Sequence, residues 1–449
     1  MKCNKKVVII LGIICLIVIC GVVTIKQMKA KKVLNEEKNE ISNIKVPPPP
    51  EEKKIDPISN NKIENNCEIF SKKIECKENN ENAIYILNNA NVKINDVEIS
   101  KSGIVDHFSY SDFYGINAAL FLKEGILNIS NSKINSNGNG TNAIFAKGYN
   151  SKVSINNLQI ETYGNRARGI DALDKATIEG ENISIITNGN KSSGITTDRG
   201  SGNINLKNVN VETNGVDSVG IYSTGNIKIT NSKINSKNSE ACVIEGENKL
   251  DLIDVEMIAN KKRGIMIMSS MPNEMKMSGT LNILNGTLNV SEGPAFYVTN
   301  NKAKINLENV KINNNSNIFI NASKNTDGEM NQESTFKDLK GGIVEMIGKK
   351  QVINGNIIVD DVSSVDITLL DDSYYKGALN QNNTKGKINI NCDNTSVIEL
   401  TGDSYINELN FENKLTIITN GYNIFYNKLN GKQENIVING EGTIKKMNM

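Results

Sequence analysis

The sequence predicts an all-β fold, a parallel β-helix solenoid preceded by a transmembrane helix, because two short patterns recur in step along most of its 449 residues. The first pattern is a small residue followed by a large aliphatic or aromatic one, and it recurs nine times at intervals of 22 to 36 residues. Repetition at a period of this size is typical of solenoids. The nine pairs are Ala83-Ile84, Ala119-Leu120, Ala143-Ile144, Gly169-Ile170, Gly194-Ile195, Gly220-Ile221, Cys242-Val243, Gly264-Ile265 and Ala295-Phe296.

The second pattern is an aliphatic residue followed two positions later by Asn or Asp. Apolar and polar residues alternate around it, as from Val153 to Asn156, which indicates a strand with one buried face. Asn or Asp then favours a turn, because its short side chain tolerates the left-handed backbone region. We therefore expect three short strands and three turns in each coil. The occurrences are Ile94/Asp96, Ile129/Asn131, Ile155/Asn157, Leu206/Asn208, Ile229/Asn231, Leu252/Asp254, Ile283/Asn285 and Leu307/Asn309, with Ile178/Gly180 interpreted as the one break.

Each position of the repeat has a predicted role. The small residue lies at a tight corner, and we assign Cys242 to that position as a buried structural thiol. The aliphatic residue after it stacks on its equivalents in neighbouring coils, roughly 4.8 Å away. The Asn and Asp side chains are expected to form a hydrogen-bonded ladder between coils, which would satisfy polar groups that are otherwise buried at a cost.

The charge balance argues against nucleic acid as a partner. The chain carries 51 basic and 50 acidic side chains, a net charge of +1, so it exerts little long-range attraction on a polyanion. Only four of the basic residues are Arg, which weakens any case for phosphate recognition. No glycine-rich phosphate loop and no metal-ligand spacing is evident, and the sequence therefore predicts no cofactor and no metal site.

Residues 1–32 are predicted to be a signal-anchor or transmembrane segment. Three lysines precede the uncharged stretch from Val7 to Ile25, which is long enough to cross a bilayer. The residues before a possible cut after Ala30 meet the signal-peptidase rule poorly, so an uncleaved anchor is favoured over a cleaved signal. We therefore expect a single-pass protein at the cell membrane with the β-helix outside, or a secreted one if the signal is cleaved.

Residues 33–60 are predicted to be a linker, because they are charged and carry four consecutive prolines from Pro47 to Pro50 that stiffen the segment. Residues 61–82 are expected to form an N-terminal cap, in which Cys67 and Cys76 are candidates for a stapling disulfide. The β-helix repeats occupy residues 83–330, and residues 331–449 are expected to continue the β-helix to a C-terminal cap.

These coils resemble the pectin-lyase-like right-handed parallel β-helix, in its adhesin-like bacterial surface-protein branch. The resemblance rests on the Asn ladder and the three-strand coils of residues 83–320, and the stretch Leu400–Tyr405 (LTGDSY) with its flanks is similar to the C-terminal part of autotransporter passengers. Val397 and Ile398 stand where such relatives often place Trp, and no C-terminal barrel or sorting signal follows. The resemblance implies a surface protein held by its N-terminal helix, but the fold hosts lyases, hydrolases and adhesins alike.

The alignment also defines a column of residues that should point outward, one after each stacked aliphatic residue. Most are aromatic or large and apolar, which suits stacking on sugar rings or packing on a partner protein. The same composition is also consistent with a face that a loop or the C-terminal segment covers, or with a column that is merely tolerated. The predicted ligand-binding residues are Tyr85, Phe121, Phe145, Tyr222, Met266 and Tyr297, and the remaining members are Asp171, Thr196, Ile244 and, in a weak tenth coil, Phe319.

The alternative function is a polysaccharide-active enzyme, a lyase or a glycoside hydrolase. By register Asp174 lies beside Arg199, with Asp171 and Asp198 in the same two coils, and such a set could serve elimination or hydrolysis. A surface ion pair between coils is the commoner role for such residues, and the lone loop residue His107 is of the kind that is usually polar surface. We therefore predict a membrane-anchored, adhesin-like protein that binds a glycan or a host or partner protein, with no catalytic residue assigned.

Overall fold

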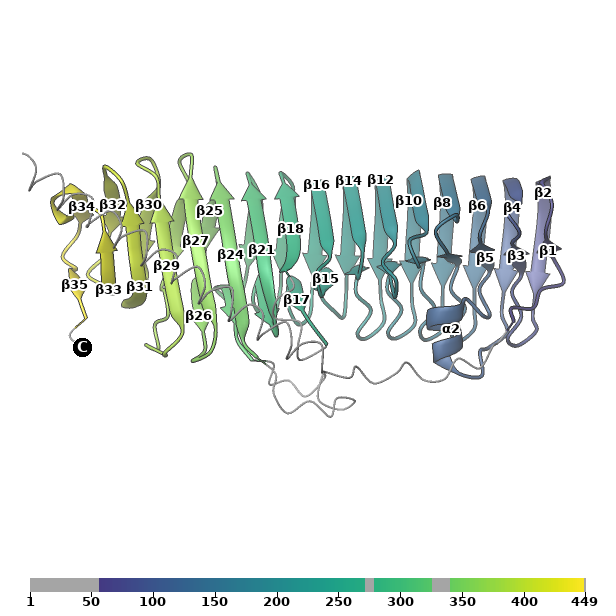
Figure 1. The fold of residues 1–449 in the computed structure, drawn as a ribbon, viewed down its shortest axis with the longest axis horizontal. Helices are drawn as coiled ribbons and strands as arrows, with labels where there is room; N and C mark the ends of the chain where they lie inside the picture. The colour runs from purple at the N-terminus through teal and green to yellow at the C-terminus, as the bar shows by residue number, and fades with distance from the viewer. Residues whose placement is uncertain (1–55, 271–277, 325–339, 448–449) are drawn as a thin grey trace, which may run out of the picture. The chain divides into compact units, whose positions relative to one another are not determined.

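A computed structural model describes residues 56–270, 278–324 and 340–447, which form a parallel β-solenoid of about 15 turns (Figure 1). Its strands run from β1 (Lys62–Ile63) to β35 (Ile444–Lys446) and pair in parallel. The predicted all-β solenoid is therefore confirmed. The predicted membrane segment, residues 1–32, and the linker up to residue 55 lie outside the described residues. In the described part, no helix has the length and apolar character needed to cross a membrane.

Three sheets form the walls of the solenoid, and we call them the short-strand sheet, the long-strand sheet and the third sheet. After β1, the short-strand sheet contains β3 (Ile84–Ile86), β5 (Leu120–Lys123), β7 (Ile144–Lys147), β9 (Ile170–Leu173), β11 (Ile195–Thr197), β13 (Ile221–Ser223), β15 (Cys242–Glu245), β17 (Ile265–Met268), β20 (Phe296–Thr299), β23 (Ile318–Ala322) and β26 (Asn356–Val359). The third sheet contains β25 (Val352–Asn354), β28 (Tyr374–Gly377), β30 (Val397–Leu400), β32 (Leu415–Ile418) and β34 (Ile436–Asn439).

The long-strand sheet runs through the whole described solenoid. Two short helices, α2 (Phe108–Tyr114) and the 3-10 helix η1 (Gln433–Asn435), interrupt the strand pattern. Before β35, the long-strand sheet contains β2 (Cys67–Cys76), β4 (Asn91–Lys101), β6 (Ile126–Ser136), β8 (Lys152–Thr162), β10 (Thr177–Thr187), β12 (Asn203–Thr213), β14 (Asn226–Ser236), β16 (Lys249–Ala259), β18 (Ser278–Leu284), β19 (Thr287–Val290), β21 (Asn301–Glu308), β22 (Lys311–Asn314), β24 (Gly342–Lys349), β27 (Ser364–Leu370), β29 (Lys387–Cys392), β31 (Ser404–Phe411) and β33 (Ile424–Asn430).

A left-handed residue bends each of the longest strands without ending it. In β12, Asn208 has a φ of 54° and lies inside an eleven-residue strand, so the two strands expected around that turn are one bent strand. The predicted ladder is confirmed, since the Asn157 amide donates to Asn131 (2.9 Å) and the Asn231 amide donates to Asn208 (2.7 Å). These bonds are exposed. The ladder therefore links neighbouring coils at the surface, and the expectation that it satisfies buried groups is wrong.

The break expected at Gly180 is an error of register. Asn182 has a φ of 59° and lies level with Asn157, so the left-handed position is kept in this coil. Gly180 takes the aliphatic place instead, opposite Ile155 and Leu206. A Cβ added there would lie 2.7 Å from the Cβ of Ile155, so the neighbouring coil fills the space that a side chain would need.

The stacked aliphatic column is confirmed in the core of the solenoid. Ile84, Leu120 and Ile144 are register partners with no exposed surface, and their equivalents continue the column. Cys242 belongs to this column, because it pairs with Ile221 on one side and with the next coil on the other. Its assignment to the corner is therefore wrong, and Ala241 holds that position. Its thiol is buried as predicted, and this burial raises the pKa of the thiol.

Residues 61–82, expected to cap the solenoid, form its first coil through β1 and β2. Cys67 and Cys76 stand at opposite ends of β2. Even with a left-handed bend at Ser71, the two extended arms rise roughly 3.3 Å per residue and hold the Cα atoms far beyond the roughly 7 Å that a disulfide spans. The proposed Cys67–Cys76 staple is therefore wrong, and both thiols are free.

Candidate functional site

The predicted outward column exists as one line across the short-strand sheet. Two of its members were misassigned, because the pairs in their coils are shifted along the chain: Val243 stands in place of Ile244, and Asn321 stands in place of Phe319. Phe319 points into the core instead, against Phe296. In order, the column is Tyr85, Phe121, Phe145, Asp171, Thr196, Tyr222, Val243, Met266, Tyr297 and Asn321.

The expectation that this column faces solvent is wrong for its first half. Tyr85 is 4% exposed, Phe121 1% and Phe145 0%. The cover is the insertion between β4 and β5, which contains α2 and packs against the Phe121 and Phe145 rings. Gly115, the left-handed C-cap of α2, lies so close that an added Cβ would be 2.6 Å from Phe145 and 2.9 Å from Phe121. Phe121 and Phe145 pack against this insertion, and Tyr85 stacks on Phe121 with the ring centres 5.0 Å apart, so all three rings are buried.

An arginine covers the far end of the same column. The Arg263 guanidinium lies 4.5 Å from the centre of the Tyr297 ring and donates to the sulfur of Met266 at 3.7 Å. It is held there by an ion pair of 2.7 Å with Glu240. Met266 and Tyr297 are only 6% and 4% exposed, so the prediction that they are exposed is also wrong. Of the six residues predicted to bind a ligand, only Tyr222 is partly exposed.

Tyr222 lines a groove of about 630 Å³ between α2 and the turn after β15. Its hydroxyl donates to the Glu245 carboxylate, which also accepts from Ser270. Burial, followed by the neighbouring Glu245 charge, raises the pKa of Tyr222 well above its ordinary value, so the phenol stays protonated as a donor. The groove is lined by Phe113, Arg168, Asp198, Arg199, Tyr222, Thr224, Glu245, Gly246, Glu247, Asn248 and Ser270.

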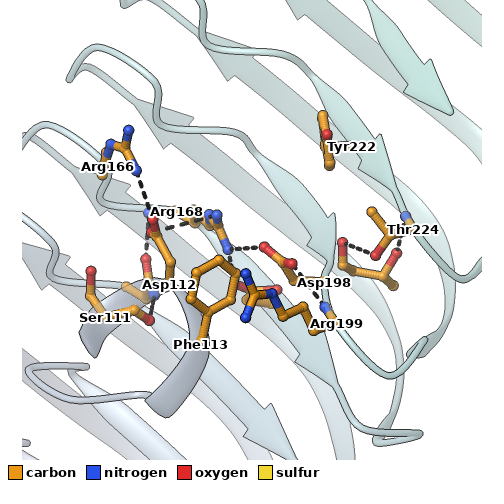
Figure 2. Close-up of polar contacts among 12 residues, drawn as sticks. Ser111, Asp112, Phe113, Arg166, Arg168, Asp198, Arg199, Tyr222 and Thr224 are labelled. Carbon is orange, nitrogen blue, oxygen red and sulfur yellow. Dashed lines mark hydrogen bonds and ion pairs between the residues drawn. The ribbon is translucent and has the colours of Figure 1, made fainter. Parts of the chain in front are cut away.

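Arg168 forms the centre of a charged cluster at one wall of this groove (Figure 2). Its guanidinium pairs with Asp171 at 2.6 Å, with Asp198 at 3.0 Å and with Asp112 at 3.5 Å. Arg166 adds a second cation, 2.8 Å from Asp112. Asp112 comes from α2, so these pairs join the insertion to two coils of the solenoid. The Arg168 side chain is 14% exposed and the Asp112 side chain 4%, so this is a buried network and not a surface pair.

Asp171 is the member of the cluster whose protonation is most altered. It has no exposed surface, and burial raises its pKa to about 7, although the adjacent Arg168 acts in the opposite direction. Two arginines face three carboxylates here, which gives a physical reason for one carboxyl to hold its proton. Arg168 stays charged, because the nearby carboxylates raise its pKa against the opposing effect of burial.

The predicted pairing of Asp174 with Arg199 holds for the backbone and fails for the side chains. The Asp174 amide donates to the Arg199 carbonyl at 3.0 Å, which confirms that the two are adjacent. The Asp174 carboxylate turns toward Lys147 (3.4 Å), whereas the Arg199 guanidinium lies 3.9 Å from the centre of the Phe113 ring. Arg199 therefore lines the groove and Asp174 does not, and the neighbouring carboxylate on that wall is Asp198.

The insertion is fixed to the solenoid by several cations, and this makes one wall of the groove rigid. Lys147 donates to the Phe113 carbonyl at 2.8 Å and lies 5.1 Å from the centre of the Tyr114 ring. Arg166 lies 5.1 Å from the centre of the Phe108 ring. His107 has a structural role, since its Nδ1 accepts from the Ser109 amide and caps the helix.

Sequence reasoning missed Asp112 and Glu245, which complete the two ends of the site. Asp112 lies in the same insertion as His107, and nothing in its position along the sequence indicates that α2 folds back on Arg168. Glu245 lies two positions after Val243, the column residue that pairs with Tyr222. A correct alignment of this coil would therefore have placed Glu245 next to the coil that contains Tyr222. The indication of this cluster in the sequence is the three-residue spacing between the oppositely charged Arg168 and Asp171.

The chain has no match among protein-family models, curated proteins or solved structures at the level that would show a relationship. The role of the groove therefore has to be inferred from its geometry. Two of its carboxylates, Asp198 and Glu245, are already held by cation or hydroxyl partners, whereas the third, Glu247, is exposed. The carboxyl with a raised pKa, Asp171, has no surface in the groove and cannot reach a bound molecule. Across the described residues, no group of His, Cys, Asp and Glu has the arrangement of a metal site. The lining combines a partly exposed ring with charged and amide groups, an arrangement that suits ligand binding.

Proposed function

We propose that this chain is an adhesin-like surface protein that binds a glycan in the groove lined by Tyr222. The observation that carries the proposal is the combination of a partly exposed tyrosine ring with Arg199, Glu247 and Asn248 along one open groove. An aromatic face packs on the apolar side of a sugar ring, while charged and amide groups bond its hydroxyls. The buried Arg168 network supports this, since it holds the groove wall in place before a ligand arrives.

The location we propose is outside the cell, with residues 1–32 as a membrane anchor and the linker as a stalk. The support is the sequence pattern alone: an uncharged stretch long enough to span a bilayer, followed by a proline-rich charged segment. On this arrangement the solenoid is a rod that presents the groove on its side.

A glycan array probed with the full chain in detergent tests the binding function. Tyr222→Ala is expected to weaken the highest-scoring glycan roughly tenfold, and Tyr222→Phe, which keeps the ring, is expected to bind nearly as well as the original protein. Tyr149→Ala is a matched control, because Tyr149 is 73% exposed and does not line the groove.

Equal binding by Tyr222→Ala and the original protein would refute the proposed site. The enzyme alternative predicts something different: incubation with acidic polysaccharides would release unsaturated products or new reducing ends, and Arg199→Met would abolish that release. Binding without any product supports the adhesin-like function.

A further inference from the structure

The apolar core is incompletely covered at both ends of the described solenoid. Apolar residues that pack against the main core while keeping partial exposure occur in the first coil, residues 56–81, and in the last coil, residues 424–447. Exposed apolar side chains lie beside them, including Phe70 (48%) at one end and Val437 (42%) and Ile438 (43%) at the other. The half-covered residues are Ile63, Cys67, Ile69, Ile74 and Cys76 in the first coil and Leu429 and Ile436 in the last coil.

Both end coils also present strands with one free hydrogen-bonding edge. Among the described residues, β2 pairs with β4 alone and β35 pairs with β33 alone. These two strands are the opposite edges of one sheet, because the long-strand sheet runs from β2 through to β35 (Figure 1). All its pairings are parallel, so the β2 edge of one molecule could continue the parallel pattern at the β35 edge of another. Free edges of this kind are templates for pairing with a further chain.

The two end coils carry opposite net charge. Residues 56–81 contain six acidic and four basic side chains, which gives −2, and residues 424–447 contain two acidic and four basic side chains, which gives +2. Lys445 and Lys446 at the basic end and Glu75 and Glu78 at the acidic end are all exposed. A contact between two first coils or between two last coils would place like charges together, whereas a first coil facing a last coil places opposite charges together.

We propose that copies of this chain associate head to tail, with the first coil of one molecule stacked on the last coil of the next. The contact joins two different surfaces, so it leaves a free first coil at one end and a free last coil at the other, and it extends into an open rod instead of a closed dimer. Stacking would cover the half-exposed core residues of both coils and pair the two free edges of the long-strand sheet. This inference is independent of glycan binding in the groove.

The test uses the full chain in detergent, with sedimentation velocity over a range of concentrations and negative-stain microscopy. Self-association that rises with concentration, and rods in whole multiples of one solenoid length, are the expected results. Lys445→Glu with Lys446→Glu reverses the charge of the last coil, and Glu75→Lys with Glu78→Lys reverses that of the first. Each double variant alone is expected to weaken association on the order of tenfold or more.

Mixing the two double variants provides the sharpest outcome. The reversed last coil of one variant is acidic and matches the reversed, basic first coil of the other, and the two unchanged ends also match. Head-to-tail rods that alternate the two variants are therefore expected to return. Val362→Lys is the matched control, because Val362 is 51% exposed and lies well away from both end coils. It is expected to associate like the original protein, and glycan binding is expected to be unchanged in all of these variants.

Three results would overturn the proposal. A chain that stays monomeric at every concentration would show that the first and last coils do not bind each other. Association that neither double variant weakens would place the contact on the sides of the rod. Weakened association that mixing fails to restore would show that the two ends do not recognise each other.

Discussion

Replacing Arg168 with methionine is expected to destabilise the protein far more than the same change at Arg199. Arg168→Met keeps much of the side-chain volume and removes the guanidinium that pairs with three carboxylates within 3.5 Å. Removing one partner of a buried ion pair usually costs about 3–5 kcal/mol, because the other partner stays buried without a counter-charge.

The cost should lie near the lower end of that range, about 3 kcal/mol. Arg166 still pairs with Asp112 at 2.8 Å, and the Arg199 amide still donates to Asp198 at 2.8 Å. Asp171 loses its partner and can be accommodated by taking up a proton. The destabilisation should therefore be larger at pH 8 than at pH 5.

Urea unfolding followed by circular dichroism measures the difference, with Arg199→Met as the control. Arg199 is exposed, forms a cation–π contact with Phe113 and is expected to contribute only about 0.5–1 kcal/mol. A loss at Arg168 no larger than that at Arg199, or one that does not change between pH 5 and pH 8, would refute the assignment of a buried charged network.

Three further predictions test other parts of the structure by the same unfolding measurement. The pKa of Asp171 is about 7 in the folded protein and lower in the unfolded chain, so stability falls as pH rises through this window. From pH 5 to pH 7 the original protein should lose about 2 kcal/mol of stability relative to the Asp171→Asn variant. Parallel curves of stability against pH for the two proteins would contradict this. Phe145→Ala should cost about 3–5 kcal/mol and Tyr149→Ala under about 0.5 kcal/mol, whereas equal small losses would mean that Phe145 is exposed after all. Asn208→Val should cost about 1–2 kcal/mol and Asn208→Gly much less, and the reverse order would argue against the left-handed bend.

The sequence predicts the coil architecture well because each coil repeats the same local demands. The αL position accepts Asn or Asp, the stacked position needs a large apolar residue, and both recur often enough to define a register. Errors arose where the pattern degenerates. In the Cys242 coil a second small residue, Ala241, stands next to Cys242, and choosing Cys242 shifted the assigned positions of β15 by one residue, whereas Leu252 and Asp254 later in the coil keep the correct register.

The exposure of the column could not be predicted, because exposure depends on what lies over a surface. Phe121 and Phe145 follow the repeat as outward residues, and only the fold of the insertion around α2 buries them. The same limitation hid Asp112, whose partners are more than fifty residues away in the chain. The aromatic residues of the column do share one surface, but most of them pack against other parts of the protein. Tyr222 lies beyond the insertion around α2 and lines the groove.

Hydrogen–deuterium exchange of the full chain, with and without the glycan that scores highest on the array, tests the central claim most directly. Bound glycan is expected to slow exchange in the segments that line the groove, residues 198–199, 222–224 and 245–248, while β3, β5 and β7 stay unchanged beneath the insertion. Protection confined to the covered column or to the end coils, with none at Tyr222, would contradict the account.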